Sequence, residues 1–474
     1  MRKLKLHLFV LFLLSVASTL LPETDFQKFE NLIKSTYSTD NYQSKTGVLP
    51  IKTIEQNIDT CIKLMDEQRK KSTGWNANSC PSRYSDTSIV VEKRPLLKKG
   101  DTIIIFGDRH GDIGSTLALL KKIEKERGKP ILGSESGFKI LDPNITIVFL
   151  GDYADRGNWS IEVIDFVCRL YNENPKQVIL IRGNHEEKEL AQIYGLLQDI
   201  LGKYQKENEK KAKTIFNMIV NKLFPRLPSL VLMGANDITT GISHYGAFCH
   251  AGLFIDYLSQ AIFAHEAPFF DYLDLEDIAN KRTILAHTIR KEFLNVLSLR
   301  LTDQKKLINS KYIDFLPWKD FSLRWLDYSP QPETCLNPGS RGSLATGKIS
   351  KDVSDTLLSL INDFLKDEKQ QIDYIFRGHQ QPDFIPEIKA GHGVAILGRE
   401  KQEKNTVLKQ NDVLTFAVGP VGYLRLFKKT GSPFDGCGVI TIGDRPGTWQ
   451  CIGYAVSQGE IKKYLNNIGK PSNQ

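Results

Sequence analysis

Carboxylate, amide and imidazole side chains gather in three short loops of this chain, each directly after an apolar segment. The loops read GDRHGD, GDYADRG and RGNHEE, and they carry Asp108 and His110, Asp152 and Asp155, and Asn184 and His185. Two later apolar segments end in the same way, at His250 in FCHAG and at His379 in FRGHQ. Oxygen and imidazole donors without thiolates suit Mn²⁺, Fe or Zn²⁺. The pattern therefore indicates a metal site.

Asp152 is the candidate for a ligand shared between two ions. Two metals about 3.5–4 Å apart can hold a hydroxide and clamp a phosphate for in-line attack. Such a pair needs a bridging carboxylate, and the charge of Asp152 at the end of a buried segment would be neutralised by the cations. A single Gly-Asp pair is ordinarily just a turn. Five such elements, each at a predicted strand end, outweigh that interpretation.

The segments around these loops predict an α/β fold. The stretches at 102–106, 145–150 and 177–181 are short and apolar, as buried strands are. The loops lead into stretches with helical spacing, such as IGSTLALLKKIEKE and SIEVIDFVCRLY. Alternation of strand, loop and helix places a site at the carboxyl ends of the strands. We therefore expect the three loops to converge there.

The composition is that of a globular enzyme-sized protein. The chain has 474 residues, 41% hydrophobic and 25% charged, with a formal net charge of +8. The run KYQKENEKKAK at 203–213 alternates in sign, which favours a solvated helix face over a nucleic-acid patch. GDIGST at 111–116 lacks the Gly-Lys-Ser/Thr of a phosphate-binding P-loop. We expect no nucleic-acid partner.

The N-terminal segment predicts a secretory signal peptide over residues 1–20. MRKLK is a positive region, and the apolar core from Leu8 to Leu14 is shorter than the ~20 residues of a membrane span. Small residues follow it, as at a cleavage site. We therefore expect a secreted or exported protein without a stable membrane span after cleavage. An uncleaved anchor or a buried first helix would make it membrane-anchored or cytoplasmic.

Seven cysteines and two glycosylation sequons bear on the compartment. Cys168 and Cys249 lie in apolar runs and are predicted to be buried thiols. Cys61 and Cys80 could form a bridge in an exported protein. Asn144 and Asn158 begin Asn-x-Ser/Thr triplets, which also arise by chance. Asn158 lies beside a charged loop, so we expect it to carry no glycan.

The ordered motifs GDRHGD, FLGDYADRG, LIRGNHEE, FCHAGL and FRGHQ resemble those of the metallo-dependent phosphoprotein phosphatase (PPP) family, the serine/threonine protein phosphatases of the calcineurin-like metallophosphoesterase superfamily. Later blocks, LRWLDYSPQP and NPGSRGSLATG, resemble family blocks in the same order. The resemblance covers roughly residues 25–455, and the joint set of motifs is specific. It implies a central β-sandwich flanked by helices, with the active site at the carboxyl ends of the strands.

The resemblance also implies roles for the site residues. One metal ion would be held by Asp108, His110 and Asp152, and the second by Asp152, Asn184, His250 and His379. His185, oriented by Asp155, would be the general acid toward the leaving alcohol. The phosphate would be bound by Arg156, Arg341 and Asn184, since a planar guanidinium suits its oxygens. The two ions would be Mn²⁺, with Fe or Zn²⁺ as alternatives.

The implied activity is hydrolysis of phosphoserine and phosphothreonine in proteins, by direct attack of a metal-bridging hydroxide. A phosphotyrosine-preferring, small-molecule or dinucleotide-polyphosphate phosphatase on the same site is an alternative. A non-catalytic docking protein is another, although no expected ligand is missing. Gln381 stands where diester-cleaving relatives often have a second histidine, which favours the protein-phosphatase branch.

We expect the chain to divide into the signal segment at 1–20, a helical region at 21–98, a catalytic domain at 99–460 and a tail at 461–474. Within the catalytic domain, 254–322 is a helical insertion relative to the family and a candidate docking surface for a regulatory partner. Asp112 replaces the glutamine that is common after the first motif. Tyr423 is a weak match to the tyrosine of a loop that overhangs the site in the family.

Overall fold

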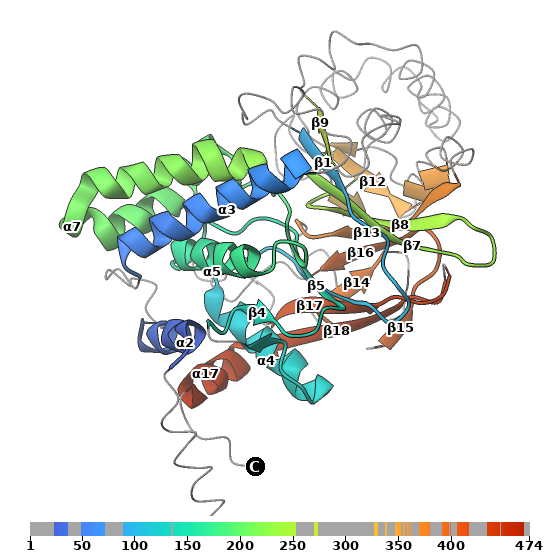
Figure 1. Cartoon of the computed structure of the whole chain (residues 1–474), viewed down its shortest axis with the longest axis horizontal. Coiled ribbons are helices and arrows are strands. Elements are labelled where there is room, and N and C mark those ends of the chain that lie inside the picture. The colour runs from blue at the N-terminus through green and yellow to red at the C-terminus, as the bar shows by residue number, and fades with distance from the viewer. Residues whose placement is uncertain are drawn as a thin grey trace, which may run out of the picture.

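The computed structural model shows a helical part beside two sheets (Figure 1). It describes residues 23–36, 49–71, 89–133, 136–252, 270–273, 327–329, 337–338, 347–351, 354–355, 358–359, 362, 369–379, 391–397, 399, 405–416, 434–445 and 447–468. The predicted signal peptide lies outside the described residues, as do Cys80, Arg341, Gln381 and Tyr423. Of the predicted insertion at 254–322, only four residues are described, and they form a strand rather than a helix.

The helices and strands follow in a mixed order. The helices are α2 (Asp25–Thr36), α3 (Ile51–Lys71), α4 (Ile113–Arg127), α5 (Ser160–Glu173), α6 (Lys188–Ile193), α7 (Leu196–Met218), the short η1 (Ile219–Leu223) and η2 (Phe224–Arg226), and α17 (Gln458–Asn467). The strands are β1 (Ile89–Lys93), β2 (Thr102–Phe106), β3 (Leu132–Gly133), β4 (Lys139–Ile140), β5 (Ile145–Phe149), β6 (Val178–Leu180), β7 (Leu230–Asn236), β8 (Ser243–Cys249), β9 (Phe270–Leu273), β10 (Asp327–Ser329), β11 (Asn337–Pro338), β12 (Gly347–Ser350), β13 (Gln370–Arg377), β14 (Val394–Ile396), β15 (Asn405–Val407), β16 (Asp412–Phe416), β17 (Phe434–Thr441) and β18 (Gln450–Ser457).

Two large sheets form the centre of the molecule. One has the order β15-β18-β17-β2-β5-β6, and the other has the order β14-β16-β13-β8-β7-β1-β9. In the first sheet β2, β5 and β6 are parallel, with Ile104 opposite Ile147 and Phe149 opposite Leu180. In the second, β13 runs parallel to β8. Within each parallel set, the carboxyl ends of the strands therefore lie at one edge, where the charged loops begin.

Strand β2 shows why these segments are apolar along their whole length. Ile103 and Ile105 pack with residues of the second sheet, such as Phe376, in the core between the sheets. Ile104 and Phe106 point the other way, into a core that the helices share. Because side chains alternate along a strand, a strand covered on both faces needs apolar residues at every position.

Helices α2, α3, α4, α5 and α7 contribute to the core on the outer face of the six-stranded sheet. In Figure 1 they lie together on one side of the strands. The predicted α/β class, a β-sandwich with flanking helices, is thereby confirmed. Helix α17 contacts α2 and α4, and it runs across the predicted boundary between catalytic domain and tail at 460.

Asp112 has a structural role that its place in the motif did not indicate. Its backbone is extended, and its carboxylate accepts a hydrogen bond from the Ser115 amide, so it caps the N-terminus of α4. A side-chain acceptor at this position satisfies one of the amides that a helix leaves without an internal partner. Asp112 therefore fixes the point at which the first charged loop turns into helix.

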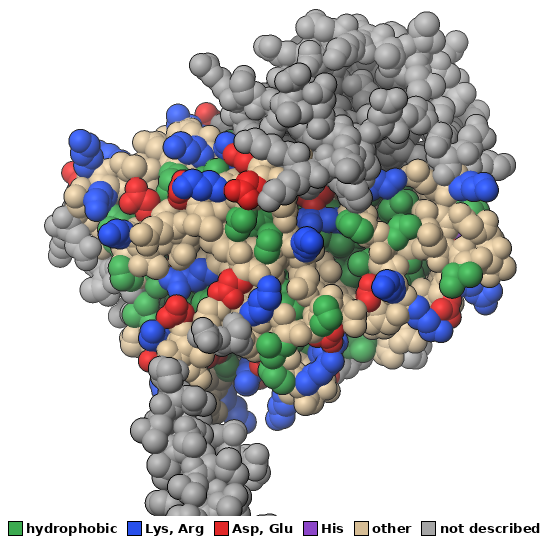
Figure 2. Space-filling model, in the orientation of Figure 1, with side chains coloured by type: hydrophobic (Ala, Val, Ile, Leu, Met, Phe, Trp, Pro, Cys, Tyr) green, Lys and Arg blue, Asp and Glu red, His purple; other side chains and the backbone are tan. Residues whose placement is uncertain are grey.

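The cysteines, the hydropathy of the helices and the surface charges can be compared with the sequence. Cys168 and Cys249 are buried thiols, as predicted. Within the described part of the chain, helices long and apolar enough for a membrane span are absent. Figure 2 shows basic and acidic side chains interspersed on the described part of one face of the molecule.

Candidate metal centre

The charged loops converge as their positions in the sequence predict. Ligand atoms of His110, Asp152 and His185 lie within 4.8 Å of one another, and so do those of Asp152, His250 and His379. These residues follow β2, β5, β6, β8 and β13, and all of them are buried. Asp152 belongs to both clusters. Its position is that expected of a carboxylate shared by two ions.

Further distances connect the remaining predicted ligands to these clusters. His110 Nε2 lies 3.7 Å from Asp108 Oδ2 and 3.4 Å from Asp152 Oδ2. Asn184 Oδ1 lies 2.8 Å from His250 Nε2 and 3.0 Å from His379 Nδ1. His250 Nε2 is also 3.4 Å from Asp152 Oδ1. All six predicted metal ligands therefore surround one small region.

The backbone orients these side chains toward the centre. His110 Nδ1 lies 3.1 Å from the Ala154 carbonyl, and His250 Nδ1 lies 2.7 Å from the Leu150 carbonyl. If each Nδ1 carries the proton and donates it, the Nε2 lone pair is left to face the site, as in histidine ligands generally. The carboxylate of Asp108 accepts the His379 amide through Oδ1 at 2.8 Å.

Two buried polar atoms at the centre indicate whether a cation would fit there. Asp108 Oδ2 and His110 Nε2 have no hydrogen-bond partner among the described residues. Buried polar atoms in folded proteins are otherwise almost always satisfied. Both atoms are donors to metals and both face the same space. The donor set of carboxylates, an amide oxygen and imidazoles therefore fits a pair of divalent cations.

The charges of the centre perturb its pKa values strongly. Burial lowers the pKa of His250, but Asp152 and Asp108 outweigh it and raise that pKa to about 9. Burial and the nearby Arg156 charge hold the pKa of His110 well below its ordinary value. Burial opposes ionisation of Asp152, yet its pKa is lowered because His250 and His185 stabilise the carboxylate. Without metal, a proton on His250 partly balances the buried carboxylates.

Mn²⁺ binding is expected to release this proton. His250 is charged below about pH 9 in the metal-free protein, and a metal ligand must be neutral. The apparent affinity should therefore rise with pH up to about 9, by roughly tenfold per unit for one released proton. Calorimetric titration with Mn²⁺ in two buffers of different ionisation enthalpy measures the release. A pH-independent affinity between pH 6 and 8 (roughly the range in which histidine ligands titrate) would contradict this expectation.

A second set of side chains lies beside the metal cluster. His185 Nδ1 is 2.7 Å from Asp155 Oδ2, and His185 Nε2 is 2.9 Å from Arg156 Nη2. The other oxygen of Asp155 accepts the Leu196 amide at 2.8 Å. Asp155 is thus fixed from two sides and in turn fixes the His185 ring. Although His185 also lies close enough to be a ligand, its Nε2 faces the Arg156 guanidinium.

The backbone of the site is strained. Among the described residues, seven non-glycine residues have positive φ, and five of them belong to this site: His110, Asp152, Asp155, Arg156 and His379. Non-glycine residues in this region cost about 1–3 kcal/mol each and persist where surrounding structure holds them. Such strain concentrates at functional sites. The loops must therefore be held by strong contacts.

Glu186 provides such a contact, which its place in the sequence does not indicate. Its Oε2 accepts the amides of Asp152 and Gly183, each at 2.7 Å, and its Oε1 accepts the Tyr153 amide at 3.0 Å. Burial, followed by the charge of Asp152, raises the pKa of Glu186 to about 8. Its carboxylate ties two ligand loops together. In the sequence Glu186 is distinguished only by its position directly after His185. The next residue, Glu187, is an acid of the same type.

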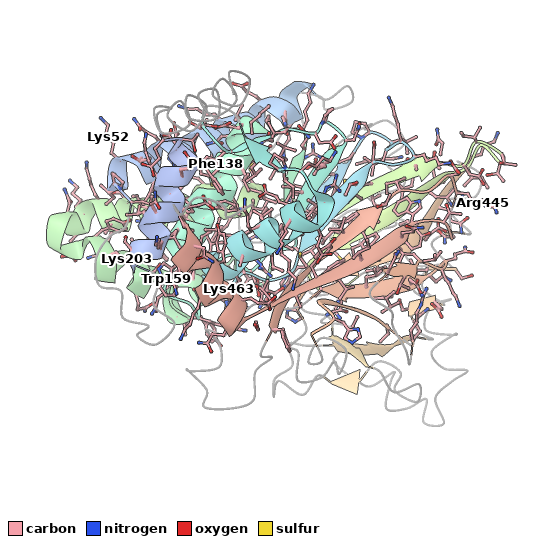
Figure 3. All side chains as sticks on the ribbon, turned by 90° about the horizontal axis from the view of Figure 1, so that it is seen from below. Lys52, Phe138, Trp159, Lys203, Arg445 and Lys463 are labelled. Carbon is pink, nitrogen blue, oxygen red and sulfur yellow. The ribbon has the colours of Figure 1, made fainter. Side chains whose placement is uncertain are left out.

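A buried lysine binds the backbone of the loop that contains Asp152 and Asp155 at its carboxyl end. Lys203 on α7 contacts Glu162 at 2.5 Å, Asp199 at 2.8 Å and the carbonyl of Asn158 at 2.5 Å. Figure 3 shows Lys203 and Trp159 in the helical part of the molecule.

The side-chain amide nitrogen of Asn158, which begins one of the two glycosylation sequons, is buried. Its burial leaves this nitrogen inaccessible in the folded protein.

The predicted site residues in the described part of the chain are thus brought together. Asp108, His110, Asp152, Asp155, Arg156, Asn184, His185, His250 and His379 all line the same region. Arg341 lies outside the described residues. Tyr194, which the sequence analysis did not single out, packs edge-on against His185 with ring centroids 5.3 Å apart, and it is 46% exposed.

Comparison with known proteins gives a consistent result. Residues 102–383, more than half of the chain, match the family described as calcineurin-like phosphoesterase. A Schizosaccharomyces pombe protein that is provisionally named a serine/threonine-protein phosphatase is 28% identical over 184 residues. That alignment covers 39% of this chain and 52% of the relative, so the chain spans about half the length of this curated relative.

Two solved structures were also compared. A Saccharomyces cerevisiae protein serine/threonine phosphatase, described as similar to human phosphatase PP5, is 18% identical with a TM-score of 0.47, covering 86% of this chain and 91% of that chain. A cold-active protein-tyrosine phosphatase of a psychrophilic Shewanella species is 16% identical with a TM-score of 0.36, covering 77% and 84%. With TM-scores below 0.5, the fold assignment stands on the sheets described above.

Proposed function

Because the chain belongs to the calcineurin-like phosphoesterase family, we propose that it is a metal-dependent protein phosphatase that hydrolyses phosphoserine and phosphothreonine monoesters. The observation that carries the proposal is the pair of ligand clusters that share Asp152, one of which includes His185, with Asp155 and Arg156 in contact with that histidine. This combination offers sites for two cations, a phosphate-binding guanidinium and a proton donor in one place.

The residues of the site divide the work of phosphoester hydrolysis. Two divalent ions, when held by Asp108, His110, Asp152, Asn184, His250 and His379, would supply Lewis acidity toward the phosphoryl group and lower the pKa of water. Arg156 is only partly buried and can grip two phosphoryl oxygens with its planar fork. Arg341 is proposed for the same task from its place in the sequence.

His185 is proposed as the general acid. Asp155 accepts from Nδ1 and stabilises the imidazolium, so Nε2 can carry the proton that the leaving alkoxide takes up. In the substrate-free structure Nε2 faces Arg156. When the guanidinium turns to phosphoryl oxygens, Nε2 is released toward the leaving group. A proton donor matters most for serine and threonine esters, because an alkoxide is a poor leaving group.

A phosphotyrosine preference is the second candidate, because of Tyr194. This side chain is partly exposed and lies against His185, where an aryl leaving group could pack on it. Ile193 beside it is 70% exposed and would extend the apolar surface. The chemistry at phosphorus would be the same in both cases, so substrate choice must be measured.

The test uses the metal-stripped full chain and matched phosphoserine, phosphothreonine and phosphotyrosine peptides, with and without Mn²⁺. The expected result is Mn²⁺-dependent phosphate release that is fastest with the phosphoserine and phosphothreonine peptides. Faster release from the phosphotyrosine peptide would favour the second candidate. If no peptide is hydrolysed although two metals are bound, the protein-phosphatase proposal is wrong, and nucleotide substrates or a docking role become the alternatives.

A further inference from the structure

Arg109 lies between two predicted metal ligands, Asp108 and His110, yet it does not face the metal centre. Its side chain turns back, and Nε donates to the Gly107 carbonyl at 3.1 Å. The guanidinium lies 5.5 Å from the centre of the Phe106 ring at the end of β2. Arg109 therefore points away from the centre that its two neighbours face.

The partner of Arg109 comes from the opposite end of the chain. Asp435 on β17 receives two parallel hydrogen bonds, from Nη1 at 2.8 Å and from Nη2 at 3.0 Å, across 326 residues of sequence. Both side chains have 0% exposure. The guanidinium also reaches the Gly436 carbonyl at 3.4 Å and the Thr116 hydroxyl at 3.5 Å. The two-point geometry fixes the orientation of the guanidinium as well as its position.

The backbone of Arg109 connects this anchor to the metal centre. The amides of Arg109 and His110 donate to the Asp152 carbonyl at 2.9 and 2.7 Å. The Arg109 carbonyl accepts the amide of Asp112, which caps α4. His110 itself has a φ of 38°, a conformation that must be held by its surroundings. A shift of Arg109 would therefore move two ligand-bearing loops.

We propose that the Arg109–Asp435 pair is a positioning device that clamps the first ligand loop to β17 and sets the separation of the Asp108, His110 and Asp152 ligands. The inference rests on the proposed metal-dependent function, since it concerns how tightly this chain holds its cations. According to this inference, the position of the metal ligands also depends on Asp435, a residue far from the ligand motifs in the sequence. Arg109 and Asp435 are positioning residues and do not touch the substrate.

The deciding measurement is Mn²⁺ binding by the full chain, by calorimetry, with kcat and KM as additional readouts. Arg109→Met should weaken Mn²⁺ binding by about 10–100-fold, the usual effect of removing a group that orients metal ligands. At saturating Mn²⁺, kcat should fall more than KM rises, because the ligands would be displaced while Arg156 remains. Arg109→Lys, which keeps the charge but loses the fork, should give a smaller loss.

Arg169→Met is the matched control. Arg169 on α5 pairs with the fully buried Asp165 at 2.7 Å, within the helical part of the molecule. Its loss removes a comparable ion pair without touching a ligand loop. We expect lower thermal stability but unchanged Mn²⁺ affinity.

A second variant covers the case in which Arg109→Met fails to fold around an unpaired Asp435. Arg109→Met with Asp435→Leu leaves no buried charge, and such apolar replacements of buried pairs are often tolerated. If the pair positions the loop, this folded double variant still binds Mn²⁺ weakly. Wild-type Mn²⁺ affinity and kcat in either folded variant would overturn the inference while leaving the proposed function intact. Absence of Mn²⁺ binding by the wild-type chain would instead overturn the proposed function.

Discussion

Asp152→Asn is expected to abolish metal-dependent hydrolysis and to lower the bound metal from two ions to one or none. Asp152 is the only residue common to both ligand clusters found among the described residues, and its two oxygens face different partners, Oδ1 toward His250 and Oδ2 toward His110. An amide cannot supply two anionic oxygens. In metalloproteins, mutation of a residue that orients a metal ligand typically lowers metal affinity or activity by about 10–100-fold. Loss of a ligand shared by two ions should therefore reduce kcat by more than about 100-fold.

Asp373→Asn is a control of the same chemistry. Asp373 is a fully buried carboxylate that contacts a histidine, His244, at 2.6 Å. The pair lies toward the amino ends of β8 and β13, whereas His250 and His379 follow the carboxyl ends. Metal content by elemental analysis and phosphopeptide hydrolysis should stay at wild-type levels in this variant. Two bound ions in Asp152→Asn would contradict the shared-ligand assignment.

His185→Ala is expected to lower kcat for a phosphoserine peptide by about 10²–10⁴-fold, the range for loss of a general acid. The effect should be much smaller for an activated aryl phosphate, whose leaving group needs no proton. Metal content should remain at two ions, because His185 contacts Asp155 and Arg156 through its two ring nitrogens. Parallel kinetics on the two substrates with elemental analysis separate these effects.

The same experiment distinguishes an acid from a ligand. His185 lies within ligand distance of His110 and Asp152, so a metal-binding role is the alternative. Loss of one ion, with equal rate losses on both substrates, would favour that alternative. His244→Ala is the matched control, because it removes another carboxylate-bonded histidine, which lies toward the amino end of β8 in the other sheet.

The sequence was sufficient to predict that the first three ligand loops converge. Each follows an apolar strand, and the carboxyl ends of parallel strands meet at one edge of a sheet. His250 and His379 follow strands of the other sheet, and their place in the site was implied by the family resemblance. The local histidine–carboxylate arrangement of His185 and Asp155 followed from the resemblance, and the structure places them in contact. Predictions on Arg341 and on the 1–20 segment remain predictions.

The contacts that hold those ligands could be found only in the tertiary structure. Glu186 looks like any acid in a charged loop until its carboxylate is seen to bind amides of two loops. Asp435 is 326 residues from Arg109, and no spacing in the sequence relates them. A buried charge without a partner is costly, so each buried charged side chain needs a partner of opposite charge or a hydrogen-bond donor. Which residue provides that partner depends on the tertiary fold. Sequence spacing thus determined which side chains could bind metal, and folding determined what keeps them in place.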